Sequence, residues 1–261
     1  MKHAPPYVPG HQLLAGKSVL ITAAAGAGIG YSAARRSAEE GCRALMISDI
    51  HPRRLDEAVE RLKAETGLAA IYGQLCNVTL EEDVQALVEV AEQRLGGVDV
   101  LINNAGLGGQ KAVVEMSDEE WSRVLDVTLT GTFRMTRAML PHMQRRGAGA
   151  IVNNASVLGW RAQKEQAHYA AAKAGVMALT RCAALEAAEH GVRINAVAPS
   201  IALHDFLKKA SSEELLASLA GREAFGRAAQ VWEVANVMMF LASDYASYMV
   251  GEVLSVSSQQ A

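Results

Sequence analysis

The chain has 261 residues, 50% of them hydrophobic and 20% charged, which is the balance of a globular protein with a sizeable core. Its formal net charge of −3 leaves no basic surplus to neutralise phosphates, so no nucleic-acid partner is expected. No apolar run reaches the roughly 18 residues that a membrane span needs, and the N-terminus lacks the apolar segment of a signal peptide. Three scattered cysteines, Cys42, Cys76 and Cys182, indicate neither disulfides nor a metal site. We therefore expect a cytoplasmic protein without a metal or membrane partner.

Short apolar runs alternate with longer segments of helical periodicity along the chain. The strand-like runs lie at residues 18–21, 44–47, 70–72, 98–102, 150–152, 193–197 and 253–256. The helical segments lie at residues 30–40, 53–66, 81–95, 118–146, 168–190 and 231–242. This alternation predicts a single doubly wound α/β domain over residues 17–261, with about seven parallel strands and helices on both faces, preceded by an arm at residues 1–16.

A glycine-rich turn follows the first expected strand and opens into a helix. Gly26, Gly28 and Gly30 lie in it, and glycine lets the backbone turn tightly and lets a pyrophosphate approach the N–H groups at a helix N-terminus. A glycine run that serves only the fold would look similar. Its place between strand and helix favours a dinucleotide site.

Asp49 closes the second expected strand, about 20 residues beyond the glycine turn. A carboxylate there accepts hydrogen bonds from ribose hydroxyls and repels a 2′-phosphate, so the sequence favours NAD over NADP. Arg53 and Arg54 follow closely and would suit that phosphate, although they also fit solvated residues at the start of a helix.

Polar residues follow the next two strands. Asn77 is placed for the adenine edge, whereas Asn103 and Asn104 either contact the cofactor or satisfy buried backbone groups between strands. For Asn103 the structural role remains at least as plausible as a direct contact.

Tyr169 and Lys173 lie four positions apart in a helical segment, so they share one face about one turn apart. A fixed ammonium beside a phenol lowers the phenol pKa from its reference value near 10 and produces a general base for an alcohol proton. An ordinary amphipathic helix often carries the same pair. Ser156, 13 residues upstream and just beyond a strand, reaches the same crevice and can donate to a carbonyl oxygen.

The segment at residues 200–225 departs from the alternation and carries Phe206, Leu207, Leu215, Leu216 and Leu219 between polar residues. It fits a small helical lid at the carboxyl edge of the sheet, where ligands of open α/β folds bind. A purely structural cap is the alternative.

Taken in order, the glycine turn, Asp49, residues 103–106, Ser156, the Tyr169/Lys173 pair and residues 193–199 resemble the short-chain dehydrogenase/reductase family across residues 16–258. The resemblance implies a Rossmann-like fold and a homotetramer, with Tyr169 as acid/base, Ser156 polarising the substrate oxygen, and Lys173 holding the nicotinamide ribose. The cofactor site that it implies comprises Thr22, Gly26, Gly28, Ile29, Gly30, Asp49, Asn77, Val78, Asn104, Ala105, Gly106, Tyr169, Lys173, Pro199 and Ile201.

Four positions depart from the family pattern. Ala23 stands where glycine is usual and an extra residue lengthens the turn, Asn77 replaces an aspartate, and Ser200 replaces a glycine. Thr128 stands where the family usually has an active-site asparagine that supports a water in the proton relay. Thr128 is therefore a candidate catalytic residue whose relay role is in doubt.

Within the family, residues 153–162 together with Thr128 and the 255–259 terminus resemble an actinobacterial group that acts on CoA-linked ring fragments in steroid degradation. This resemblance implies a bulky alicyclic acyl-CoA substrate, with Ser156, Tyr169 and Trp160 in the substrate site. Trp160 would wall an apolar pocket or pack against the lid. The alternatives are a 3-oxoacyl-thioester reductase that uses NADPH and a catalytically weak, NAD-binding interaction protein.

Overall fold

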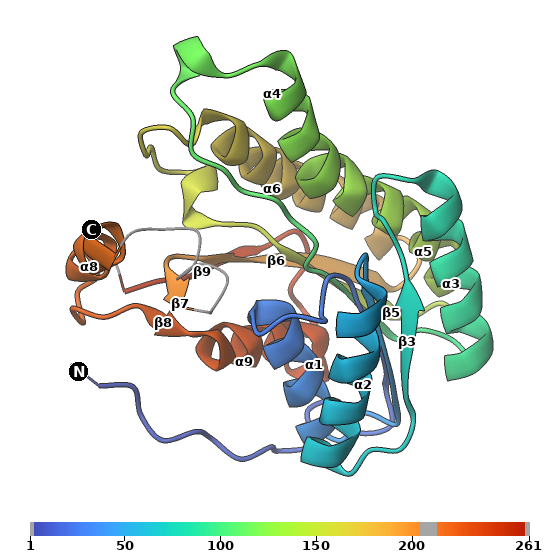
Figure 1. Ribbon diagram of the computed structural model, residues 1–261. Helices are drawn as coiled ribbons and strands as arrows, with labels where there is room; N and C mark the ends of the chain where they lie inside the picture. The colour runs from blue at the N-terminus through green and yellow to red at the C-terminus, as the bar shows by residue number, and fades with distance from the viewer. Residues whose placement is uncertain (1–2, 204–212, 259–261) are drawn as a thin grey trace.

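The computed structural model describes residues 3–203 and 213–258 and is built on a parallel sheet of seven strands, as the sequence predicts (Figure 1). The strand order is β3-β2-β1-β4-β5-β6-β9. The strands are β1 (Ser18–Ile21), β2 (Ala44–Asp49), β3 (Ile71–Leu75), β4 (Val100–Asn103), β5 (Gly149–Asn154), β6 (Val192–Pro199) and β9 (Val253–Val256). Successive strands are added on one side of β1 up to β3 and on its other side from β4 onward. The crevice at such a topological switch point, here between β1 and β4, is where doubly wound folds bind ligands.

Helices cover both faces of the sheet. The helices α1 (Ile29–Glu39), α2 (Pro52–Thr66) and α9 (Val231–Ala242) pack into one apolar core, and α3 (Glu81–Leu95), α5 (Gly131–Arg146) and α6 (Ala167–Ala188) pack into the other. Strand β2 feeds both cores, because Leu45 and Ile47 enter the first while Ala44 and Met46 enter the second. Burial on both faces explains why the strands are continuous apolar runs in the sequence.

The long helix expected at residues 118–146 is interrupted by one wider turn. Helix α4 (Asp118–Leu125) starts at a capping box made by Ser117 and Glu120, and the π-helical segment η2 (Asp126–Thr130) joins it to α5. Such π turns are found mainly at functional sites. This one carries Thr128, which is fully buried.

The arm before β1 is held by a buried ion pair on α1. The Glu40 carboxylate accepts hydrogen bonds from the N–H groups of His11 (2.7 Å) and Leu13 (3.1 Å) and lies 2.6 Å from the Arg36 guanidinium. Arg36 also donates to the carbonyls of Val8 and Pro9. The arm is therefore held through its peptide groups at this pair, and the Tyr7 side chain adds contacts with Glu39 and Trp232.

The expected lid region begins where β6 ends. A short strand, β7 (Ala202–Leu203), pairs in parallel with β8 (Ala229–Gln230), and α8 (Glu213–Gly221) lies between them in sequence. Phe206 and Leu207 fall outside the described residues, so the structure does not test their place in a lid. No helix within residues 3–203 and 213–258 has the length and apolar character to cross a membrane.

Candidate active site

Tyr169 and Lys173 lie in the first two turns of α6, and their side chains meet as expected. The Lys173 Nζ atom is 5.6 Å from the centre of the Tyr169 ring, and Lys173 is only 3% exposed. Ser156 follows β5 and caps a short 3₁₀ turn, η3 (Val157–Gly159), by accepting a hydrogen bond from the Leu158 N–H at 3.2 Å. The Ser156 side chain also hydrogen-bonds the Tyr169 phenol. The structure therefore brings the three predicted catalytic side chains together.

Burial disfavours the charged form of both groups on α6. It raises the pKa of the Tyr169 phenol above 10.0, with the Ser156 hydrogen bond acting in the opposite direction. It lowers the pKa of Lys173 to about 8. The expected lowering of the phenol pKa by Lys173 is thus not found in the protein alone, because desolvation is the dominant cause and the group that opposes it is Ser156.

Lys173 has hydrogen-bonding capacity left over. An ammonium has three donors, and within the described chain Nζ donates one hydrogen bond, to the Asn154 carbonyl at 2.5 Å. No carboxylate of the described residues lies within ion-pair distance of it. A buried cation with two unmatched donors fits a ligand that carries a pair of hydroxyls, which a ribose does.

The turn between β1 and α1 has the shape that the sequence predicts. Ala23 adopts a left-handed backbone conformation (φ +53°), which explains why glycine is usual there in the family that this chain resembles. A Cβ atom on Gly30 would lie 2.6 Å from the Ala23 carbonyl oxygen and would also collide with the Asn104 amide. Gly26, Gly28 and Ile29 lead into the N-terminus of α1, which no side chain caps. The free N–H groups of such an end are a binding site for phosphate.

The end of β4 is tied to the end of β1. The Thr22 hydroxyl accepts hydrogen bonds from the N–H groups of Asn104 and Ala105, both at 3.0 Å. The Asn104 amide donates to the carbonyls of Thr22 (3.2 Å) and Ala23 (3.0 Å). These three predicted cofactor residues therefore shape the turn itself.

Asp49 lies beside the glycine turn. One carboxylate oxygen accepts a hydrogen bond from the Ala25 N–H and the other from the His51 N–H, each at 3.2 Å. Arg54 is 3.8 Å from the second oxygen, so a negative and a positive side chain lie together beside the glycine turn.

The other predicted cofactor residues take varied positions. The Asn77 amide oxygen accepts from the N–H (3.1 Å) and hydroxyl (2.9 Å) of Thr79, and Val78 is buried. Pro199 ends β6, and the Ile201 carbonyl accepts a hydrogen bond from the Ala229 N–H at 2.9 Å. Trp160 follows the η3 turn and is 52% exposed.

Thr128 lies under the segment that follows β4. A Cβ atom on Gly106 would be 3.8 Å from the Thr128 hydroxyl and 3.4 Å from the Lys173 Nζ atom. The hydroxyl itself bonds both backbone groups of Leu107. The Thr128 hydroxyl and the Lys173 ammonium therefore both lie close to Gly106.

Two asparagine pairs join β4 and β5. Asn103 donates to Asn153 (2.9 Å) and Thr136 (3.2 Å) and is buried in the core, which supports its structural role. In the second pair Asn154 donates to Asn104 at 3.0 Å. The sequence analysis did not single out Asn154, because its pairing with Asn104 depends on the strand register that the structure shows, in which Asn103 lies opposite Asn153.

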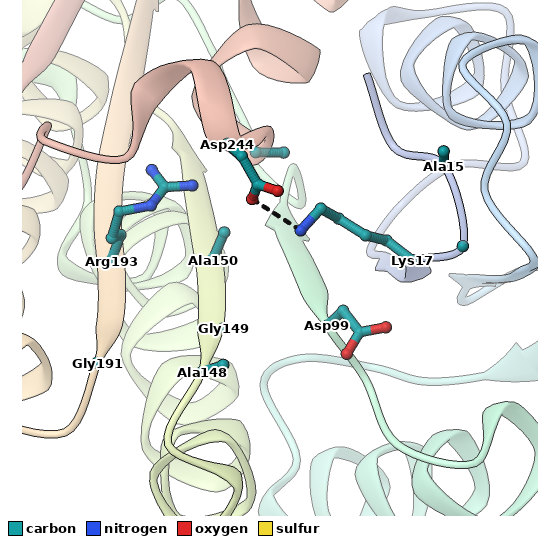
Figure 2. Close-up of a pocket in the computed structure, with 11 residues that line it drawn as sticks. Ala15, Lys17, Asp99, Ala148, Gly149, Ala150, Gly191, Arg193 and Asp244 are labelled. Atoms are coloured by element: carbon teal, nitrogen blue, oxygen red, sulfur yellow. Dashed lines mark hydrogen bonds and ion pairs between the residues drawn. The ribbon is translucent and has the colours of Figure 1, made fainter. Parts of the chain in front are cut away.

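One hollow within the described residues lies away from this chemistry. A cavity of 390 Å³ lies at the amino ends of β1, β4, β5 and β6, where Lys17 pairs with Asp244 at 2.9 Å near Asp99 and Arg193 (Figure 2). Ser156, Tyr169 and the glycine turn all lie at the carboxyl ends of the strands. We therefore assign the chemistry to the carboxyl edge, where polar groups converge.

Comparison with known proteins identifies the family. A family model described as enoyl-(acyl carrier protein) reductase matches residues 23–258. A solved short chain dehydrogenase from Mycobacterium smegmatis is 56% identical, with a TM-score of 0.88, and the match covers 100% of this chain and 99% of that one. The chain belongs to the short-chain dehydrogenase/reductase family. It is accordingly an oxidoreductase, as the sequence predicts, and a nucleotide of the NAD(P) type is the cofactor of its family.

Three relatives within this family differ in substrate. A (5R,7aS)-5-hydroxy-7a-methyl-1-oxo-2,3,5,6,7,7a-hexahydro-1H-indene-carboxyl-CoA reductase from Mycobacterium tuberculosis is 60% identical, over 98% of this chain and 97% of the relative. A cis-4-hydroxycyclohexanecarboxylate dehydrogenase from Sinomonas cyclohexanicum is 40% identical over 91% and 94%. A 3-oxoacyl-[acyl-carrier-protein] reductase from Thermotoga maritima is 37% identical, over 93% of this chain and 97% of the relative.

Proposed function

We propose that this protein interconverts a ring hydroxyl and a ketone on a bulky alicyclic acyl-CoA, using NAD. The observation that carries the proposal is the cluster of Ser156, Tyr169 and Lys173 at the carboxyl edge of the sheet, beside the glycine turn. The names of two relatives support the substrate class, since both describe ring compounds that carry an oxygen substituent and a carboxyl group. The 3-oxoacyl reductases are more distant, which favours the ring compound over a linear thioester.

In the oxidation direction Tyr169 takes the proton of the alcohol. The Ser156 hydroxyl donates a hydrogen bond to the same oxygen and orients it. Lys173 would hold two ribose hydroxyls with its unmatched donors, and a positive charge beside the phenol would favour the Tyr169 phenolate. A bound nicotinamide would supply the hydride acceptor for the substrate carbon, and the positive charge of its oxidised ring would further favour the Tyr169 phenolate.

Asp49 supports the choice of NAD. Its carboxylate is next to the glycine turn, where it would accept hydrogen bonds from ribose hydroxyls and repel a 2′-phosphate. Arg54 opposes this preference without abolishing it, because at 3.8 Å it does not make a close ion pair. A cytoplasmic location, a homotetramer, a lid at residues 200–225 and an apolar wall formed by Trp160 complete the proposal by family resemblance.

Turnover by the purified protein tests the proposal. The substrates are the CoA thioester of cis-4-hydroxycyclohexanecarboxylate, the free acid and 3-hydroxybutyryl-CoA, each with NAD and with NADP. We expect the ring thioester with NAD to have the highest kcat/KM, by about tenfold or more over the linear thioester. Faster turnover of the linear thioester with NADP would instead establish the 3-oxoacyl-thioester reductase, and no turnover with cofactor binding intact would favour the interaction protein.

A further inference from the structure

Asn154 occupies the end of β5 between the two halves of the site. Its backbone carbonyl accepts the hydrogen bond from Lys173, and its side-chain amide donates to Asn104. Asn104 in turn donates to the carbonyls of Thr22 and Ala23 in the glycine turn. A continuous chain of hydrogen bonds therefore runs from the glycine turn through Asn104 and Asn154 to Lys173.

The direction of each amide in this chain follows from its partners. The NH₂ group of Asn104 faces two carbonyl oxygens, so its oxygen must face Asn154. Only the NH₂ group of Asn154 can meet that oxygen, at 3.0 Å. The Asn154 amide oxygen consequently points elsewhere, and it is buried without a hydrogen-bond partner among the described residues.

An arrangement of this kind contributes little to folding. One amide hydrogen bond stabilises by about 1 kcal/mol, whereas one buried, unpaired acceptor costs about 1–3 kcal/mol. The Asn154 side chain therefore contributes little to the stability of the fold. Because Asn154 contacts the groups on both sides that we propose to hold the cofactor, we infer that it has a role in the site.

We propose that Asn154 is a positioning residue that fixes Lys173 relative to the glycine turn. It acts by holding the end of β5, and so the carbonyl on which the ammonium rests, at a set distance from Ala23. The two ends of a dinucleotide would be held by the glycine turn and by Lys173, so their separation governs cofactor affinity. This inference rests on the proposed function.

The test compares Asn154→Leu, Asn154→Ala and the control Asn153→Leu with the wild type. For both Asn154 variants we expect the Kd of NADH and the KM of NAD to rise roughly three- to tenfold, with the KM of the alcohol unchanged. The melting temperature without cofactor should change by less than about 3 °C, or rise in Asn154→Leu, because the unpaired acceptor is removed. The stabilisation that NADH confers should shrink.

Asn153→Leu is a matched control from the adjacent position of the same strand. Its amide oxygen accepts from Asn103 and its NH₂ group donates to Thr180 at 2.9 Å, so both ends have partners. We expect this variant to lose melting temperature and to keep the NADH Kd. Asn104→Ala, which breaks the same chain at its middle link, should weaken NADH binding in a way that is not additive with Asn154→Ala.

The outcomes separate this inference from the proposed function. A wild-type protein that binds no NADH would contradict the proposed function. Tight binding by the wild type with an unchanged NADH Kd in both Asn154 variants would overturn the role of Asn154 alone. The same holds if the losses of NADH binding free energy in Asn154→Ala and Asn104→Ala add fully in the double variant.

Discussion

The Thr128 hydroxyl accepts a hydrogen bond from the Leu107 N–H at 2.9 Å and donates one to the Leu107 carbonyl at 3.2 Å. A hydroxyl has one proton, so while both bonds last that proton is committed to Leu107. Thr128 therefore fixes the segment after β4 against Tyr169, whose ring lies 3.7 Å from a Cβ atom built on Gly108. This geometry favours support of the site over a direct part in proton transfer.

Replacing Thr128 separates these two roles. Thr128→Ser keeps the hydroxyl and should retain wild-type kcat/KM, whereas Thr128→Val keeps the shape and loses both hydrogen bonds. We expect Thr128→Val to lower kcat/KM by roughly tenfold, since the N–H and the carbonyl of the partly buried Leu107 lose their partner. The pH dependence of kcat should not shift. A shifted pH profile or a changed solvent isotope effect in Thr128→Val would instead indicate a relay.

Tyr169→Phe tests the acid/base. The substitution removes the phenol while leaving the shape of the pocket nearly unchanged, so the loss should fall on kcat, by roughly 10²-fold or more. The NADH Kd should change little. Stopped-flow and steady-state rates at saturating NAD give the comparison, and a variant with more than about half of wild-type kcat would place the base elsewhere.

Lys173→Met tests the cost of the buried ammonium. Burial lowers the Lys173 pKa from 10.5 to about 8, so the unfolded chain binds more protons than the folded one between these values. Stability should therefore rise with pH across this interval, and below pH 8 the buried charge is a full penalty. We expect Lys173→Met to raise the melting temperature of the cofactor-free protein at pH 7 by a few °C, on the order of 1 kcal/mol or more.

The advantage of Lys173→Met should diminish as the pH increases from 8 toward 10.5, while NADH binding and turnover are lost at every pH. Calorimetric scans at pH 7, 8.5 and 10 check this. A variant that is less stable than the wild type at pH 7 would mean that the ammonium has a stabilising partner.

Asp49 and Arg54 together test cofactor choice. Wild-type kcat/KM should be at least about tenfold higher for NAD than for NADP, equivalent to about 1.4 kcal/mol. Asp49→Asn should narrow this ratio by removing the repulsion of a 2′-phosphate, and Arg54→Ala should widen it by removing the cation 3.8 Å away. A wild type that prefers NADP, or an Asp49→Asn ratio equal to that of the wild type, would contradict the assignment.

Much of the fold was predictable because the central strands have a clear apolar signature, whereas β3 has exposed and polar positions and β7 and β8 are only two residues long. Strands buried on both faces, such as β2, leave no alternation to misjudge, and the glycine turn marks the first helix start. The π turn at Thr128 was not predictable, since an extra residue in a helix leaves the apolar periodicity on either side nearly intact. Ala23 adopts the left-handed conformation that glycine favours, so the turn keeps a glycine-like backbone at this position.

The candidate site was predictable where one residue type carries the chemistry, as at Ser156, Tyr169 and Lys173. It was not predictable where function depends on how two amides face each other. The link from Asn154 to Asn104 follows from strand register and from the carbonyls around Ala23, none of which is written in the local sequence. The same limit applies to the pKa of Tyr169, which depends on burial by distant segments.

The buried pair of Arg36 and Glu40 has a consequence for the N-terminal arm. Both side chains hydrogen-bond the arm through peptide N–H and carbonyl groups between Val8 and Leu13, and the Arg36 guanidinium also lies 5.4 Å from the centre of the Tyr7 ring. For these hydrogen bonds the number of residues along the arm matters more than the identity of most of its side chains. A shortened arm would leave the Arg36 guanidinium and the Glu40 carboxylate enclosed without their backbone partners, so this buried pair constrains the length of the arm.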